Sequence, residues 1–158
     1  MVILGLDYGD RRIGAAVTDP LEIAATALET IERTPDGSEF DELGRLIEER
    51  GVDRILVGLP LRMDGSEGIQ VRKVRSFVKD LKQRFPQVEV ETSDERLTSA
   101  QAHRALSEAG ASNRVRKRNV DSMSAQLILN RYLQRRTVQK RQHEDNSEDE
   151  QPGGETHQ

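Results

Sequence analysis

The stretch Ile3-Leu4-Gly5-Leu6-Asp7-Tyr8-Gly9-Asp10-Arg11-Arg12-Ile13-Gly14 decides the fold, because it joins two apolar runs through a short polar turn. We expect strands over Val2–Asp7 and Ile13–Thr18, paired as a hairpin. A carboxylate at the end of a buried strand is costly unless a cation or hydrogen-bond donors compensate it. Asp7 is therefore either a functional group placed at a strand end or a turn residue of the hairpin. The glycines on both sides of it would let a phosphate or a metal approach the backbone.

The elements that follow the hairpin predict an α/β fold. Three strands come first and then strands alternate with helices, in the order βββαβαβα followed by one more helix, which favours a five-stranded mixed sheet flanked by helices. In such a sheet the first, fourth and fifth strands would lie side by side. The expected strands after the hairpin are Ala25–Ile31, Arg54–Gly58 and Val88–Thr92, and the expected helices run from Ser38 to Gly51, from Ser66 to Pro86, from Thr98 to Glu108 and from Val120 to Arg135.

Length and composition indicate one folded domain with an acidic tail. Of 158 residues, 34% are hydrophobic and 33% charged, and apolar side chains end near residue 137. We expect a domain over residues 1–136 and a disordered tail over residues 137–158. Without cysteine, no disulfide, thiolate zinc site or thiol nucleophile is possible. With neither a signal peptide nor a membrane-spanning stretch in view, we expect a soluble, cytoplasmic protein with no membrane partner.

The net charge of −4 conceals three segments of different sign. Residues 1–95 carry 13 basic and 20 acidic side chains, residues 96–141 carry 11 and 2, and residues 142–158 carry none and 6. The basic middle segment predicts contacts with nucleic-acid phosphates, which weaken steeply with salt. The alternative is an ordinary solvated helix face. With so few aromatic residues, recognition of backbone or shape is favoured over base stacking.

Two further carboxylates could join Asp7. Glu95 follows the fifth strand, and Asp121 lies at the start of the final helix. If the first and fifth strands end at one sheet edge, Asp7 and Glu95 can point into one crevice. Carboxylates that share a cleft repel one another, so a divalent cation is expected, Mg²⁺ or Mn²⁺ for oxygen ligands. The alternatives are a surface ion pair of Glu95 with Arg96 or Arg11, and a helix N-terminal acid at Asp121.

With these motifs in hand, the chain closely resembles the putative pre-16S rRNA nuclease family, also described as Holliday-junction-resolvase-like, of the ribonuclease H-like superfamily. The resemblance covers residues 1–136 and implies a ribonuclease H-like nuclease domain with catalytic and metal-binding acids at Asp7, Glu95 and Asp121. It also implies phosphodiester hydrolysis in 5′-end maturation of precursor 16S rRNA. The matching segments are Gly5–Gly9 with Arg12–Gly14, Val57–Pro60, Met63–Gly68, Val74-Arg75 with Phe77, Asp94–Thr98 and Val120-Asp121.

The chain departs from the family pattern at three places. The family usually has Lys-Gly where this chain has Lys117-Arg118, Ala-Ala where it has Ser124-Ala125, and often Asn where it has Arg62. Loss of the glycine would change how closely the backbone approaches a substrate. The residues expected to bind nucleic acid are Arg12, Arg62, Arg114, Arg116, Lys117 and Arg118.

The leading hypothesis is therefore a Mg²⁺- or Mn²⁺-dependent nuclease acting on precursor rRNA. A four-way DNA junction resolvase is the first alternative, and it would require a dimer. A non-catalytic RNA-binding ribosome-assembly factor is another alternative. An actin- or hexokinase-like phosphate binder is a further one, although the chain is short for the second domain that such a fold needs. The loop over residues 57–68 is either a phosphate-binding loop or only a connection. Expected partners are nucleic acid and a ribosomal or pre-ribosomal particle, with the protein a monomer or a weak homodimer.

Overall fold

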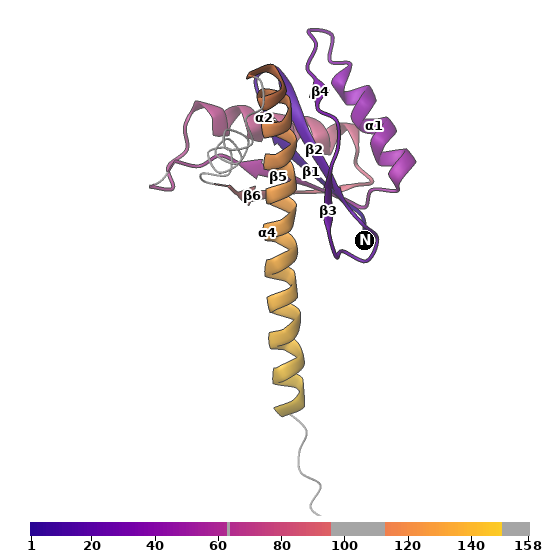
Figure 1. Cartoon of the computed structure of the whole chain (residues 1–158), viewed down its shortest axis with the longest axis vertical. Coiled ribbons are helices and arrows are strands. Elements are labelled where there is room, and N and C mark those ends of the chain that lie inside the picture. Colours follow the sequence, from indigo (N-terminus) through magenta and orange to yellow (C-terminus); the bar gives the residue numbers. More distant parts are fainter. Residues whose placement is uncertain (63, 96–112, 150–158) are drawn as a thin grey trace, which may run out of the picture.

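A mixed β-sheet forms the centre of the molecule in the computed structural model, which describes residues 1–62, 64–95 and 113–149 (Figure 1). Side chains at 113–121 and 147–149 lie outside that description. The strand order is β3-β2-β1-β5-β6, with β4 also paired to β2, and the pairs β1–β5 and β5–β6 are parallel. This is the arrangement that the ribonuclease H-like resemblance implied. The strands are β1 (Ile3–Tyr8), β2 (Arg12–Thr18), β3 (Ala25–Ala27), β4 (Ile31–Glu32), β5 (Arg54–Leu59) and β6 (Glu89–Asp94).

Helices cover both faces of the sheet, and each face has its own hydrophobic core. Leu4 and Leu6 of β1 belong to the core shared with α1 (Glu39–Arg50) and α2 (Ile69–Arg84). Ile3, one residue along, belongs to the core shared with α4 (Asn113–Asp149). Because side chains alternate along a strand, the odd-numbered residues of β1 face α4 and the even-numbered ones face α1 and α2.

The expected third strand is divided in two. β3 pairs Ala27 with Ala16, whereas β4 pairs Ile31 with Ile13. The step from Ala27 to Ile31 is thus four residues, whereas the matching step along β2 is three. An extra residue of this kind interrupts the ladder and bends the strand. The sheet therefore has six strands where five were expected, while the order and direction of the others are as predicted.

The two helices on the first face begin and end close to the expected residues. Gly51 ends α1 in the left-handed conformation, at φ 61°, as its position after the apolar repeat predicted. The predicted side-chain caps are absent, since Ser38 makes no capping hydrogen bond and α2 begins after Gly68 rather than Ser66. The helix expected over Thr98–Glu108 lies outside the described residues.

Helix α4 is longer than predicted at both ends. It runs from Asn113 to Asp149, so residues 137–149, expected to be disordered, are helical and extend beyond the body of the protein (Figure 1). Adding a residue to an existing helix is far cheaper than starting one, and this segment contains neither glycine nor proline. Despite its length α4 is too polar to cross a membrane, and no other helix within the described ranges is long and apolar enough to do so.

Candidate active site

Asp7 lies within β1 near its carboxyl end, not in the hairpin turn. It is paired with Gly14 of β2, and the turn closes one step later through a hydrogen bond from Gly9 N–H to the Arg12 carbonyl at 3.0 Å. The strand alternation places Asp7 on the face covered by α4. The interpretation of Asp7 as a turn residue is therefore wrong.

Glu95 lies on the same face of the sheet, directly after the carboxyl end of β6, with β5 between β6 and β1. Ser93 is paired with Gly58 of β5, and Glu95 continues the strand as its backbone N–H donates to the Leu59 carbonyl at 3.1 Å. A Cβ built on Gly58 would lie 3.4 Å from Glu95 Cγ, so the glutamate side chain passes over this glycine. The parallel pairing of β1, β5 and β6 thus brings Asp7 and Glu95 to one edge and one face, as the sequence predicted.

The Glu95 carboxylate is buried and bound by polar side chains. It is 4% exposed, accepts a hydrogen bond of 2.6 Å from the Ser93 hydroxyl and one of 3.1 Å from Arg131 Nη1. Arg135 donates to the Ser93 hydroxyl at 2.9 Å and lies 3.9 Å from Glu95. These contacts replace the water that a buried carboxylate loses. The predicted surface pairing of Glu95 with Arg11 or Arg96 gains no support from these contacts.

Sequence reasoning missed Ser93, Arg131 and Arg135 as members of this site. It assigned Arg131 and Arg135 only to a general basic surface, although both guanidinium groups stay partly exposed beside Glu95. Their spacing of four residues, which places them on one side of a helix, was the available signal. They place two positive charges next to the candidate catalytic carboxylate, where a phosphate would also be attracted.

The glycines near Asp7 serve helix packing and the turn rather than access for a ligand. A Cβ on Gly5 would lie 2.6 Å from Leu129, and one on Gly58 would lie 2.5 Å from Ile128. A Cβ on Gly9 would meet the Arg12 carbonyl at 2.7 Å, within the hairpin turn. The expectation that Gly5 makes room for phosphate or metal is therefore corrected, because Gly5, like Gly58, brings α4 close to the sheet.

The hairpin turn beside Asp7 is anchored by an aromatic and cationic cluster. The Tyr8 ring stacks on Phe77 with centroids 4.2 Å apart, and the Arg33 guanidinium lies 4.5 Å from the Tyr8 centroid. Arg33 also donates hydrogen bonds to the carbonyls of Gly9 at 2.9 Å and Asp10 at 2.8 Å. Burial raises the pKa of the Tyr8 phenol, so this ring remains neutral. These contacts therefore hold the turn, and with it the end of β1 that carries Asp7, in one conformation.

The third predicted acid is in place only as part of the α4 backbone. Asp121 lies within α4, but its side chain is outside the described residues, as are those of Arg114, Arg116, Lys117 and Arg118. Within the side chains that are described, no three His, Cys, Asp or Glu residues are grouped so as to hold a metal ion. The donor chemistry at Asp7 and Glu95, carboxylate oxygen alone, fits Mg²⁺ or Mn²⁺.

The remaining nucleic-acid-binding candidates have different surroundings. Arg12 on β2 lies 3.7 Å from Glu32, and its buried Nε has no hydrogen-bond partner among the described groups. Arg62 is exposed, in the loop before α2, with its guanidinium folded over Gly68. Of these two described side chains, that of Arg62 has the exposure expected of a phosphate contact.

Known proteins of similar sequence place the chain in a family. A family model described as RuvX: Holliday junction resolvase matches residues 1–135. The chain belongs to the RuvX family. Two relatives of this RuvX chain are named putative pre-16S rRNA nuclease. The protein of Maridesulfovibrio salexigens is 40% identical over 85% of this chain and 99% of the relative. The protein of Clostridium novyi is 44% identical over 84% of this chain and 98% of the relative. Among solved structures, Thermus thermophilus RuvC with a Holliday junction substrate matches at 15% identity and TM-score 0.48, covering 87% of this chain and 96% of that one.

Family membership identifies the enzyme class of this RuvX chain. It is a nuclease, a hydrolase that acts on phosphodiester bonds, and it therefore binds nucleic acid, as the sequence motifs predicted.

Proposed function

We propose that this chain is a divalent-metal-dependent nuclease that trims precursor 16S rRNA at its 5′ end, with Asp7, Glu95 and Asp121 as its catalytic acids. The observation that carries the proposal is the position of Asp7 and Glu95 on the α4 face of the sheet, at the carboxyl ends of β1 and β6, which both pair in parallel with β5 between them. The names of the curated relatives, putative pre-16S rRNA nuclease, support the choice of RNA.

Helical spacing supports the inclusion of Asp121. Ala125 and Ile128 belong to the core between α4 and the sheet, and Asp121 precedes them by four and seven residues. Residues at this spacing share one side of a helix. The sequence thus predicts Asp121 on the side of α4 that faces β1 and β5.

Mg²⁺ or Mn²⁺ at these carboxylates would orient a water molecule and stabilise the leaving oxygen of the phosphodiester. The chain supplies the surroundings for that chemistry. Ser93 and Arg131 hold the Glu95 carboxylate in one orientation, and its burial excludes bulk water. Arg131 and Arg135, with side chains 35% and 54% exposed, remain accessible to the substrate phosphate.

The test is a cleavage assay with 5′-extended small-subunit rRNA precursor, Mg²⁺ or Mn²⁺, and a chelator control. We expect Asp7→Asn and Glu95→Gln to lose at least about a hundredfold in rate. Two neighbouring carboxylates serve as matched controls. The variants Asp10→Asn, in the exposed turn after β1, and Glu91→Gln, in β6, should cut at the wild-type rate. Cleavage that survives both Asp7→Asn and chelation would exclude this assignment.

A four-way DNA junction is the second candidate substrate, favoured by the description of the matching family model. Paired symmetric cuts at a junction require two copies acting together. The same assay with a four-way junction beside the RNA precursor separates the two substrates. Cleavage of the junction in preference to the RNA would replace precursor rRNA as the proposed substrate.

A further inference from the structure

Helix α2 is strongly basic, although it belongs to the part of the sequence whose net charge is acidic. Residues 69–84 carry six basic side chains and a single acidic one, Asp80. They hold six of the 13 basic side chains of residues 1–95, a concentration that the net charge of that segment conceals. So many positive charges on one surface helix make it a candidate contact for phosphates.

Four of these basic residues form a stripe along one side of α2, and we call them the α2 stripe. They follow one another at intervals of three, four and three residues, a spacing that keeps side chains on one side of a helix. The four residues, all of them exposed, are Arg72, Arg75, Lys79 and Lys82. At 1.5 Å per residue the α2 stripe is about 15 Å long.

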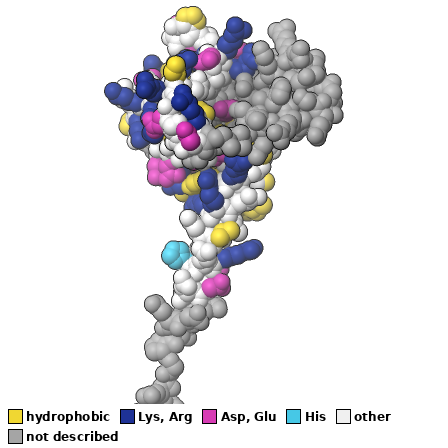
Figure 2. All heavy atoms as spheres, turned by 90° about the vertical axis from the view of Figure 1, so that its left-hand side faces the viewer, with side chains coloured by type: hydrophobic (Ala, Val, Ile, Leu, Met, Phe, Trp, Pro, Cys, Tyr) yellow, Lys and Arg dark blue, Asp and Glu magenta, His cyan; other side chains and the backbone are white. Residues whose placement is uncertain are grey.

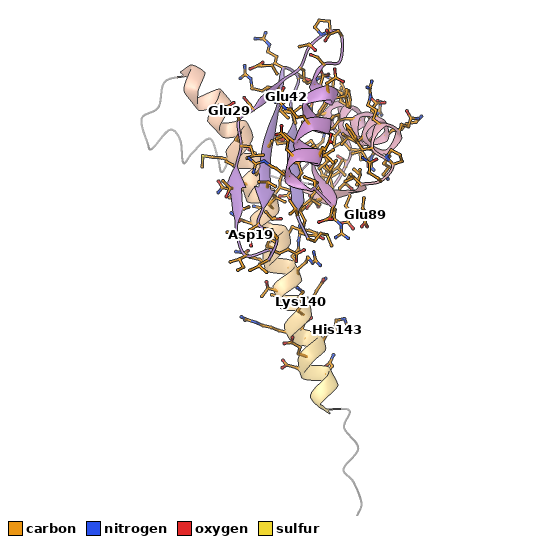
Figure 3. All side chains as sticks on the ribbon, turned by 90° about the vertical axis from the view of Figure 1, so that its right-hand side faces the viewer. Asp19, Glu29, Glu42, Glu89, Lys140 and His143 are labelled. Atoms are coloured by element: carbon orange, nitrogen blue, oxygen red, sulfur yellow. The ribbon has the colours of Figure 1, made fainter. Side chains whose placement is uncertain are left out.

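The α2 stripe faces strand β6 rather than α1. A groove of about 900 Å³ runs between the stripe and β6, and its lining includes Arg75, Lys79, Lys82, Val90 and Thr92. Another side of α2 contacts α1, where the Arg84 guanidinium lies 4.2 Å from the centre of the Phe40 ring. Figure 3 shows Glu89, at the start of β6, below α2 and apart from Glu42 on α1. The stripe is thus open to solvent on the β6 side.

The acidic side chains of β6 do not neutralise the groove. Val90 belongs to the core shared with α1 and α2, so the even-numbered residues of β6 face α2 and the odd-numbered ones face α4. Glu91 therefore faces α4, where its carboxylate lies 3.7 Å from Arg54 Nη1. The even-numbered acid, Asp94, stands at the carboxyl end of the strand, next to Glu95.

Three of the four cations of the α2 stripe have no ionic partner within the described residues. Arg75 is the exception, since its Nε donates to Glu67 at 2.9 Å. Ion pairs of the described residues involve none of the other three, Arg72, Lys79 and Lys82. Because they are exposed, these three side chains are available to an anionic ligand.

The groove begins at the sheet edge that carries the candidate catalytic acids. Gln70 donates a hydrogen bond to the Tyr8 carbonyl at 3.2 Å, and Lys73 pairs with Asp10 at 3.0 Å, so α2 starts beside the end of β1. β6 ends at the same edge, directly before Glu95. Figure 2, which faces the side on which α2 begins, shows Lys and Arg side chains across the upper body. The α2 stripe thus leads away from the active-site edge along β6.

We propose that the α2 stripe and the groove beside β6 bind the phosphate backbone of the RNA substrate outside the cleavage site. This inference rests on the proposed function, because it continues the site of Asp7 and Glu95. Within the described residues β6 is the end strand of the sheet, so Glu95 and the α2 stripe flank the same strand from opposite faces. Contacts of Lys and Arg with phosphates do not depend on base sequence, so the stripe would position the RNA rather than select its bases. An acidic peptide would meet the same cations, but continuity with the active-site edge favours the substrate.

RNA binding in the presence of a chelator tests this proposal separately from cleavage. The probe is a fluorescent single strand of about 24 nucleotides from the 5′ extension, whose anisotropy is measured between about 50 and 200 mM salt. Lys79→Ala/Lys82→Ala should bind it at least about tenfold more weakly at about 100 mM salt. The slope of log affinity against log salt should fall by about 1.4, which is about 0.7 for each lost phosphate contact.

Arg45→Ala/Arg50→Ala removes two exposed positive charges from α1 and is the matched control. It should keep the wild-type salt slope and an affinity within about twofold of wild type. Urea unfolding should show that both variants fold, because all four positions are exposed on helices. Equal losses in the two variants would overturn the proposal, since they would reflect net charge alone. Wild-type affinity in Lys79→Ala/Lys82→Ala would overturn it as well, whereas a wild type that binds no RNA would also overturn the proposed function.

A cross-linking experiment tests whether the RNA lies on the α2 stripe itself. The chain has no cysteine, so one substitution supplies a unique attachment point for a photo-cross-linker. A reagent attached at Lys79→Cys should cross-link to the RNA probe, and one attached at Arg45→Cys should not. Equal yields at the two positions, or none at Lys79→Cys, would overturn the proposal. Loss of the cross-link at a lower concentration of poly-glutamate than of unlabelled RNA would overturn it too, by assigning the stripe to an acidic protein.

Discussion

Arg131 Nη1 lies 3.1 Å from Glu95 Oε2, and this ion pair joins α4 to the end of β6 across 36 positions of sequence. The carboxylate is almost fully buried, whereas the arginine is about one-third exposed. Glu95 therefore depends on the pair more than Arg131 does.

Arg131→Ala is expected to lower the free energy of unfolding by about 2 kcal/mol, less than the loss of a partner in a fully buried pair because Arg131 is partly exposed. Urea unfolding measures the change. Combining it with Glu95→Gln should recover part of the loss, since the uncompensated buried charge is then gone. Additive losses in the double variant would contradict the ion-pair role.

Gly58→Ala is expected to destabilise the fold by about 1–3 kcal/mol, because the new methyl group overlaps Ile128 Cδ1. Ile128→Val deletes that methyl group and should restore much of the stability when the two changes are combined. Thermal unfolding of both single variants and the double variant measures the coupling. If Gly58→Ala has no effect, the close approach of α4 to β5 is wrong.

Ser124→Ala is expected to raise stability by about 1 kcal/mol. The Ser124 hydroxyl is buried and has no hydrogen-bond partner among the described groups, and alanine is the better helix former. The change also restores the residue usual in the family. A fall in the midpoint of thermal unfolding would show that the hydroxyl has a partner after all.

Asp19→Asn should destabilise the β2–β3 turn in a pH-dependent way. Hydrogen bonds from backbone N–H groups hold the pKa of Asp19 below its usual value of about 3.9, and the bond from Ala24 has the largest effect. A lowered pKa in the folded state contributes stability above the unfolded pKa, which is lost as pH falls through the folded pKa. The difference in urea midpoint between wild type and variant should therefore be constant above about pH 5 and shrink below about pH 4. A difference independent of pH would contradict this role of the charge.

A chain that ends at Arg136 should bind RNA at low salt as tightly as the full chain, within about twofold. Along a continuous helix the acidic residues from Glu144 onward lie about 40 Å from the basic run that ends at Arg118, too far to shield it within one molecule. Salt titrations of RNA binding measure both affinities. A tenfold gain in affinity on truncation would contradict this expectation and indicate that the acidic residues shield the basic run.

Local patterns in the sequence were sufficient to predict four of the five expected strands and the first two helices. They also placed two of the three candidate acids at strand ends. Alternation along β1 and helical spacing in α2 are set by neighbouring residues, so they can be read without tertiary structure. The third strand was harder, because its division depends on an extra residue relative to β2, which a single-strand pattern does not reveal. The length of α4 exceeds what the apolar pattern predicts, because a polar segment without a core-facing side continues a helix that has already formed.

The sequence by itself determined that Asp7 and Glu95 each stand at the end of an apolar strand of an α/β fold, because apolar runs and alternation are set by neighbouring residues. Only the tertiary structure decided that both lie on the α4 face of the sheet, and that Arg131 from α4, with Ser93 and Arg135, surrounds the Glu95 carboxylate. It also decided that Gly5 and Gly58 admit α4 rather than a ligand. The physical reason is that a buried charge is stabilised by whichever polar groups packing brings next to it. Here those groups come from α4, which packs on the sheet but is distant from Asp7 and Glu95 in sequence.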